Sequence, residues 1–459
     1  MSKYSRVGFA TKLGGMLAAA GSAIGLGNIW RFPIQAGQSG GSAFILIYLL
    51  CVALFGIPLL ISEFAIGRHA RANVGNAYRV LAPNTLWKWI GPLSVLVAFL
   101  IFCYYNVVVG WVFYYTWDSL LGTFVSMGSG TEAVEAFGEH FNSFITNPWK
   151  PIICLIIVTA MCHFVVVSGV QSGIEKTSKI LIPGLFIIMI FLAVFAFFMP
   201  GATQGYKFLF AMDFSAITPK VILSALGQCF YSLSIGVGLI TYASYFRRDV
   251  NLTNTAVSIG VMASLVAVLA GIIIFPAVFS VEGMSPEFGA GLVFVALPNV
   301  FNTALSGVPF LAWLVPVLFY VILLLAALTS TIFLQEVTTA YVSETFGTTR
   351  HRASLYVTIS VLLLGIACSL SLGPWSEFKI FGLNLFDFVD SLTAKFILPI
   401  TGLGASLFVG WKLTTRQLWS ELTSYGKIRF GWVRTFLFLV RFLIPSLIVL
   451  IMLSNFDLI

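Results

Sequence analysis

Long apolar runs recur along the whole chain, from Leu17 to Leu453, and they constrain its fold more than any other feature. No polar stretch between them is long enough to form a soluble domain. Only 9% of the 459 residues are charged, whereas an average soluble domain has about 25%. Because so few charges cannot cover a water-soluble globule, the sequence predicts that the whole chain is embedded in a membrane. A secretory signal would instead be a single short apolar stretch.

Eleven transmembrane spans are predicted from these runs, at about 20 apolar residues per crossing. They lie near residues 13–36, 42–66, 90–122, 150–168, 179–199, 217–245, 254–281, 310–344, 353–372, 384–411 and 433–454. With the N-terminus inside, the outer loops hold only the lysines Lys150, Lys207, Lys220 and Lys379. The positive-inside rule then predicts a multi-pass protein of the cell (inner) membrane, with residues 1–12 in the cytoplasm. Because the number of spans is odd, we expect the C-terminal Asp457 outside.

Composition also excludes several classes of function. The formal net charge of +8 is accounted for by this topology and by contact with anionic lipid, and no clustered basic face points to a nucleic-acid partner. The six cysteines lie in apolar segments and the four histidines are scattered, which argues against a disulfide framework and a structural metal site. A channel would need repeated pore-lining motifs, and an enzyme would need a nucleophile with a base or a metal cluster. The sequence has neither, so we expect no enzymatic activity.

Two of the spans carry clustered glycine near mid-membrane. The first span holds Gly21, Gly25 and Gly27, and the sixth holds Gly236 and Gly238. Glycine weakens a helix, although a pair spaced like Gly21 and Gly25 also marks close helix packing. Two interrupted spans five positions apart are typical of an inverted five-helix repeat that binds substrate where the breaks meet. The freed amides near Gly27 could hold a carboxylate, and freed carbonyls could coordinate a cation.

Charged residues inside the spans are functional candidates, because a charge at the bilayer centre costs about 2.5–3.5 kcal/mol on insertion scales. They are Arg31, Glu63, Glu336, Asp387, Asp390, Lys395 and Arg441. Arg31 lies about one turn outside the first break and Asp390 near the outer end of the tenth span, so this pair could close the site from outside. Glu63 and Arg441 could equally have structural roles.

Several motifs together resemble a known family. They are Gly21-Ser-Ala-Ile-Gly-Leu-Gly-Asn-Ile-Trp-Arg-Phe-Pro33, Gly40-Gly41-Ser42-Ala43-Phe44, Gly56-Ile-Pro58, Glu63, Gly67-Arg68, Tyr104-Tyr105, Gly173-Ile-Glu175-Lys176, Gly227-Gln228 and Thr241-Tyr-Ala-Ser-Tyr245. This set resembles the neurotransmitter:sodium symporter family, and especially its bacterial, eleven-span amino acid transporters. The resemblance implies an all-α polytopic membrane protein with the LeuT-type fold, in one domain over residues 1–459. Its first repeat would occupy residues 13–199, the second, inverted repeat 217–411, and an eleventh span 433–454.

The resemblance implies sodium-coupled import of a neutral, hydrophobic amino acid, bound at the two breaks. The carboxylate would lie beside Gly25 and meet Leu26, Gly27 and Tyr105. The amine would face Ala23, Tyr231, Ser232 and Ser234. The side-chain pocket would be lined by Ile101, Tyr105, Tyr231, Val237, Ser330 and Leu334. Glycine at position 25 leaves room for a substrate with its own carboxylate, whereas the monoamine carriers have an aspartate near this position.

Sodium sites are implied in the same way. The second Na⁺ site of the family maps onto Gly21, Ile24, Ala326, Thr329 and Ser330. Taken alone, hydroxyls in mid-helix more often bond to their own backbone, but beside an unwound span they are suitable oxygen ligands for Na⁺. The first Na⁺ site maps onto Ala23, Asn28 and Ser232, but the polar residue expected in the seventh span is replaced by Ala263. Only the neighbouring Ser264 could substitute, so one or two Na⁺ are expected.

A chloride requirement is left open, because position 267, where chloride-dependent members of the family have a serine and chloride-independent members a carboxylate, is Ala267 here.

The resemblance also implies transport by alternating access. Arg31 and Asp390 would form the outer gate, and Arg6 and Glu344 the inner gate. Two alternatives also stay open at this point. The substrate could be taurine or another non-α amino acid, and the chain could be a transport-dead sensor with the same fold.

Overall fold

The computed structural model describes residues 7–130, 133–281, 290–428 and 431–455, and this part of the chain forms helices and loops without a β-strand. An apolar chain in lipid must satisfy its backbone groups within each segment, and a helix does so. The predicted all-α architecture is therefore confirmed for the described residues.

The first half of the chain contains the helices that include the first five predicted spans. Their bounds are α1 (Lys12–Ala23), η1 (Gly27–Arg31), α2 (Phe32–Gln38), α3 (Ser42–Cys51), η2 (Val52–Gly56), α4 (Ile57–Ala70), α6 (Ile90–Leu120), α9 (Lys150–Val167), η4 (Val170–Glu175) and α10 (Lys176–Ala196). Shorter helices lie in the connections, namely α5 (Val74–Leu81), η3 (Leu86–Trp89), α7 (Thr123–Ser126), α8 (Ala133–Ile145) and α11 (Ala202–Phe210).

The second half contains the sixth to eleventh predicted spans. Their bounds are α12 (Pro219–Ser232), α13 (Leu239–Ala243), α14 (Leu252–Val278), α16 (Pro309–Phe346), α17 (Arg350–Leu370), α18 (Leu385–Ser391), η7 (Leu392–Ile397), α19 (Leu398–Leu407), η8 (Phe408–Lys412), α21 (Val433–Phe438), η9 (Leu439–Leu443) and α22 (Ile444–Asn455). The connections hold η5 (Phe214–Ala216), η6 (Ala290–Leu292), α15 (Ala296–Ala304) and α20 (Thr415–Leu422).

Within the described residues, nine helical segments are long and apolar enough to cross a membrane, and ten if α1 and the segment Gly27–Gln38, bent by 51°, are counted as one. The remaining predicted span, 217–245, is divided into α12 of 14 residues and α13 of 5 residues. Neither piece reaches the length of about 20 residues that a crossing needs. The count therefore falls below the eleven predicted spans because the sixth is broken near its middle.

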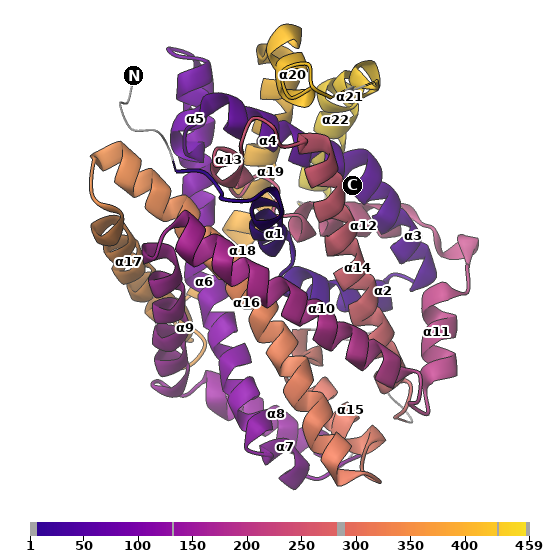
Figure 1. Cartoon of the computed structure of the whole chain (residues 1–459). Coiled ribbons are helices and arrows are strands. Elements are labelled where there is room, and N and C mark those ends of the chain that lie inside the picture. Colours follow the sequence, from indigo (N-terminus) through magenta and orange to yellow (C-terminus); the bar gives the residue numbers. More distant parts are fainter. Residues whose placement is uncertain (1–6, 131–132, 282–289, 429–430, 456–459) are drawn as a thin grey trace.

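The long helices α6, α9, α16 and α17 pack against one another, while α4, α13 and α14 form a second group, and α1 contacts both α14 and α16. Figure 1 shows α1 near the centre of the molecule, with α5, α20 and α21 at one end and α7, α8 and α15 at the other. Following the predicted topology, we call these the inner and the outer end. The broken spans thus lie in the middle of the helix bundle.

Small residues allow α1 to pack this closely. A Cβ added to Gly21 would lie 3.0 Å from Thr329 Cβ, and one added to Gly14 would lie 2.1 Å from Glu175 Oε1. Such close approach of helices is a general use of glycine in membrane proteins. The packing interpretation of Gly21 is therefore correct as well, and it places the first break directly against the middle of α16.

A buried ion pair holds α20 against the inner end of α4. Arg68 is 1% exposed, and it donates from Nε to Glu421 Oε2 at 2.6 Å and from a terminal nitrogen to the Val250 carbonyl at 2.5 Å. His69 Nδ1 and the Tyr425 hydroxyl lie 3.1 and 2.7 Å from Glu421 Oε1. Burial raises the pKa of Glu421, but hydrogen bonds from His69 and Tyr425 and the charge of Arg68 outweigh it and lower the pKa to about 2.

Candidate functional site

The first span is broken at residues 24–26. Helix α1 ends at Ala23 and the next residue, Ile24, is extended, with φ −103° and ψ 95°. The helix resumes at Gly27 as a π-turn. Between the two pieces, the Leu26 amide donates to the Tyr105 hydroxyl at 3.2 Å. The break predicted from the glycine cluster is therefore present, and it brings the chain to α6.

The sixth span is broken at residues 233–238. Three residues here have left-handed backbone angles, with φ of 51° at Ser234, 83° at Gly236 and 124° at Gly238. A glycine adopts such angles without the steric cost of a Cβ. The Ser234 hydroxyl donates to the Ser22 carbonyl at 2.6 Å, which joins the two breaks. The Gly236 amide donates to Glu63 Oε1 at 2.6 Å, so Glu63 stabilises the break and has a structural role.

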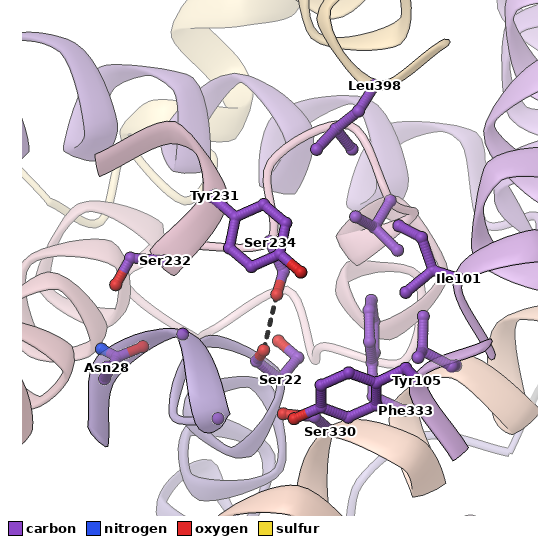
Figure 2. A pocket seen from close by; sticks show the side chains of 14 residues that line it. Ser22, Asn28, Ile101, Tyr105, Tyr231, Ser232, Ser234, Ser330, Phe333 and Leu398 are labelled. Atoms are coloured by element: carbon purple, nitrogen blue, oxygen red, sulfur yellow. Dashed lines mark hydrogen bonds between the residues drawn. The ribbon is translucent and has the colours of Figure 1, made fainter. Parts of the chain in front are cut away.

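The two breaks enclose a cavity of about 60 Å³. It is lined by Ser22, Gly25, Gly27, Asn28, Ile101, Tyr105, Tyr231, Ser232, Ser234, Val237, Ser330, Phe333, Leu334 and Leu398. Figure 2 shows Asn28 and Ser232 on one side and the apolar Ile101, Phe333 and Leu398 on the other. The cavity therefore has a polar side at the broken backbone and an apolar side formed by α6, α16 and α19.

Most of the residues predicted to bind substrate line this cavity, but two of them do not. Ala23 is buried in α1 outside the lining, and Leu26 contributes its amide and lines a second, outer cavity. Sequence reasoning missed Ser22, Phe333 and Leu398. Phe333 follows Ser330 by three residues, so helical periodicity would have placed it on the same face. Leu398 comes from the tenth span, for which no sequence signal pointed inward.

Gly25 is required by the packing around the cavity. A Cβ at this position would lie 2.6 Å from Ser330 Oγ and 3.3 Å from the Tyr105 hydroxyl oxygen. A separation below 3.0 Å forces a neighbouring atom to move. Ser330 and Tyr105 thus pack closely around Gly25, and a side chain at this position would displace one of them.

The oxygen atoms predicted for the second Na⁺ site come together between α1 and α16. Thr329 Oγ1 lies 3.4 Å from the Ile24 carbonyl, and Ser330 Oγ lies 3.3 and 3.5 Å from the carbonyls of Gly21 and Ile24. Thr329 Oγ1 also bonds to its own helix, at the Ala326 carbonyl, 2.8 Å away. Carbonyl and hydroxyl oxygens are the ligands that hard cations prefer, so this donor set fits Na⁺.

The residues predicted for the first Na⁺ site are arranged differently from expectation. Asn28 Oδ1 is buried without a hydrogen-bond partner among the described residues, while its amide nitrogen donates to the Ala263 carbonyl at 2.9 Å. The seventh span thus contributes a backbone carbonyl at this point. Ser264 lies beside Tyr48, whose hydroxyl is 3.2 Å from Ser232 Oγ. The Asn28 oxygen, which has no partner among the described residues, fits a cation, and the role of Ser264 at this site stays a prediction.

A larger cavity of about 520 Å³ opens on the outer side of the first. Gly27, Tyr105, Tyr231 and Leu398 line both. Arg31 and Asp390 both line the outer cavity, but within the described chain no ion pair joins them. The Arg31 guanidinium instead lies 4.4 Å from the centre of the Tyr231 ring. The two residues of the predicted outer gate therefore share one cavity and are not paired in this conformation.

The inner end is closed by side chains from several segments. Glu344 Oε2 accepts from Asn73 Nδ2 at 2.6 Å, and its predicted partner Arg6 lies outside the described residues. The Tyr245 hydroxyl donates to Glu336 Oε1 at 2.6 Å, and Glu336 is also ion-paired with Arg350. Sequence reasoning did not find these contacts, because nothing in the spacing relates α13, α16 and α17.

Comparisons with known proteins agree with this geometry. The model of the sodium:neurotransmitter symporter family matches residues 6–135 and 131–458. The chain belongs to the sodium:neurotransmitter symporter family. The uncharacterized sodium-dependent transporter YhdH of Bacillus subtilis is 37% identical over 455 residues, which are 99% of this chain and 98% of the relative. As a member of a symporter family the chain is a transporter and not an enzyme.

Two further relatives are informative about the site. The crystal structure of MhsT in complex with L-phenylalanine superposes with a TM-score of 0.87 at 39% identity, covering 98% of this chain and 100% of that one. This likeness confirms the LeuT-type fold. The sodium-dependent neutral amino acid transporter B(0)AT3 of Mus musculus is 33% identical over 309 residues, which are 61% of this chain and 48% of the relative.

Proposed function

We propose that this symporter couples the inward movement of Na⁺ to the import of a neutral, hydrophobic amino acid by alternating access. The observation that carries the proposal is the cavity at the two breaks, which has a polar backbone side, an apolar side and a glycine, Gly25, in its lining. MhsT, the relative solved with L-phenylalanine, and B(0)AT3, a neutral amino acid transporter by name, support this substrate class.

In this proposal the zwitterionic end of the substrate lies at the broken helices. Its carboxylate is next to Gly25 and Tyr105, where the N-terminal end of the resumed helix at Gly27 favours an anion. Its side chain faces Ile101 and Phe333 on the opposite side of the cavity. A neutral apolar side chain is favoured because a charged one would lose its hydration there without a partner.

Tyr105 and Tyr231 line both the substrate cavity and the outer cavity. This shared lining suggests the order of events in transport. Substrate enters from the outer side, and Arg31 and Asp390 then approach each other and close it. The inner contacts of Glu344 and Glu336 open in the next step. Arg6, predicted as the partner of Glu344, would take part in this inner gate.

In this proposal the second Na⁺ site links α1 to α16, because its oxygens come from the end of α1 and from the middle of α16. At a membrane potential of about 100 mV, inside negative, one entering Na⁺ supplies about 2.3 kcal/mol. A tenfold Na⁺ gradient adds about 1.4 kcal/mol, and together they permit about 500-fold accumulation of substrate. Two ions would square this limit, so the stoichiometry decides how far the transporter can concentrate its substrate.

Uptake into proteoliposomes tests the core of the proposal. We expect that an imposed inward Na⁺ gradient drives accumulation of a labelled amino acid, and that replacing Na⁺ by K⁺ on both sides abolishes it. Accumulation that does not depend on the Na⁺ gradient would refute the coupling. Ligand binding without counterflow would identify a transport-dead sensor with the same fold.

The substrate and the ions are best identified by thermal shift. The purified protein is screened with the twenty amino acids, taurine and γ-aminobutyrate, in Na⁺ or K⁺, and with or without Cl⁻. We expect the largest stabilisation from apolar amino acids in Na⁺. A response to taurine or γ-aminobutyrate alone would overturn the proposed substrate class. The Cl⁻ arm probes the hydroxyl cluster of Tyr48, Ser232 and Ser264, and a Na⁺ titration probes the number of ions.

A further inference from the structure

Arg441 is a positively charged residue inside the eleventh span. The span runs from Val433 to Asn455, and Arg441 lies about two turns, roughly 12 Å, from its inner end. Among the described residues no ion pair involves Arg441. A charge at this position is costly in hydrocarbon. The side chain therefore needs polar or aromatic contacts, and the described protein supplies some of them.

The protein holds the Arg441 side chain in a defined place. Its Nε donates to the Gly410 carbonyl at 2.6 Å, and its guanidinium carbon lies 5.7 Å from the centre of the Trp411 ring. Trp411 Nε1 in turn approaches the Arg441 carbonyl at 3.4 Å. These contacts keep the guanidinium at the level of Trp411, where the tenth span ends at Lys412. The arginine is thus anchored and does not extend freely to water.

Two irregular helical turns create this arrangement. The π-turns η8 and η9 face each other, and the Ser406 hydroxyl donates to the Val440 carbonyl at 2.8 Å. A Cβ on Gly410 would lie 3.0 Å from Arg441 Cγ, so glycine is needed for the close approach. Irregular turns of this kind are frequent at functional sites. The irregular backbone of both spans therefore holds Arg441 at the surface between the tenth and eleventh spans.

The surroundings of Arg441 face lipid. Trp411 is 61% exposed, Phe438 58% and Phe442 51%, and exposed aromatic rings near the end of a span mark the boundary between headgroups and hydrocarbon. An arginine has five N–H donors. Only Nε has an acceptor among the described residues, so the donors of the two terminal nitrogens are available to a ligand. This fork matches the geometry of a phosphate group.

We propose that Arg441 and Trp411 form a binding site for the phosphate of an anionic phospholipid in the inner leaflet. The acyl chains would pack along Phe438 and Phe442. An anionic headgroup is favoured over a zwitterionic one because exposed basic residues lie at or between the adjoining ends of the tenth and eleventh spans. They are Lys412, Arg416 and Arg434. Each basic residue near a charged leaflet adds about 1 kcal/mol of attraction, and basic pockets between spans are a recurring form of lipid site.

Lipid-dependent thermal unfolding tests this proposal on the full-length protein in detergent. Phosphatidylglycerol, phosphatidylcholine and inorganic phosphate are titrated separately. We expect phosphatidylglycerol to raise the Tm in a saturable way, and the other two to have little effect. Stabilisation by inorganic phosphate equal to that by phosphatidylglycerol would overturn the assignment to lipid, and equal stabilisation by phosphatidylcholine would overturn the preference for an anionic headgroup.

Two variants localise the effect. Arg441→Gln should weaken the apparent affinity for phosphatidylglycerol at least about tenfold, which corresponds to about 1.4 kcal/mol. The matched control Arg352→Gln removes an exposed basic residue at the start of another span, α17, and should change the affinity less than about threefold. An Arg441→Gln protein with the affinity of the unmodified one would refute the site.

A third variant and a second measurement cover the case in which Arg441→Gln fails to fold. Arg441→Lys keeps the charge and loses the fork, so we expect an intermediate affinity; unchanged affinity would refute bidentate binding. A photoactivatable phosphatidylglycerol applied to the unmodified protein should label peptides that contain Trp411 or Phe442. Labelling confined to other spans would overturn the proposal.

Discussion

Replacing Gly25 by alanine tests the proposed substrate cavity most directly. The added methyl group would lie 2.6 Å from Ser330 Oγ and 3.3 Å from the Tyr105 hydroxyl oxygen. Overpacking of this kind costs about 1–3 kcal/mol when the surroundings must shift. Because the methyl group occupies space that the substrate carboxylate would use, we expect this cost to fall on binding. Substrate affinity should decrease about 5- to 150-fold.

The assay is the KM of amino acid uptake into proteoliposomes at saturating Na⁺, together with substrate affinity from thermal shift. Saturating Na⁺ is needed because Ser330 also belongs to the predicted second Na⁺ site. Gly184→Ala is the matched control, since a Cβ at this position in α10 would only make ordinary contact with Leu325 Cδ1, 4.0 Å away. A folded Gly25→Ala protein whose KM stays within about twofold of the unmodified protein would refute the assignment of the cavity.

Three further substitutions follow from the structure. Thr329→Ala and Ser330→Ala should each raise the Na⁺ concentration needed for half-maximal uptake, and an unchanged Na⁺ dependence would contradict the second site. Asp390→Asn should slow transport while substrate affinity in Na⁺ is kept, because the gate pair acts after binding; a loss of binding equal to the loss of transport would argue against a gate. Glu421→Gln should lower the Tm by several degrees, since it leaves the buried Arg68 uncompensated, which costs about 3–5 kcal/mol. The pKa of Glu421 is lowered to about 2 from 4.5, so its stabilisation is complete above about pH 4.5 and is lost as the pH falls toward 2; a Tm difference between the two proteins that does not shrink in acid would contradict this.

The sequence was most informative about the site where a residue type is rare in its setting, as clustered glycine is in a transmembrane helix. Clustered glycine in an apolar span predicted both breaks, and the first lies at residues 24–26 as expected. The family resemblance assigned Thr329 and Ser330 to the second Na⁺ site, and their hydroxyls lie near the carbonyls of Ile24 and Gly21 at the first break. Clustered glycine is a local property of the chain, so no knowledge of distant neighbours was needed to infer the breaks.

Other parts of the site depend on contacts between distant segments. Glu63 accepts a hydrogen bond from the Gly236 amide at the second break, and Ser264 lies beside Tyr48. Helix rotation about its own axis decides such contacts, and a one-residue difference turns a side chain by about 100°. The sequence pattern of the seventh span, which is apolar on nearly every face, does not define this rotation.

By itself the sequence determined that the chain is a polytopic membrane protein, that two spans are interrupted, and which family it resembles. Apolar length and glycine content act locally, and the membrane allows few alternatives to a helix. Only the tertiary structure decided that Arg31 lies on Tyr231 and is not paired with Asp390, and that Arg441 is held beside Trp411. The physical reason is that the role of a charged side chain inside a membrane protein depends on the group it contacts. That group belongs to whichever helix the packing of the whole bundle brings beside it.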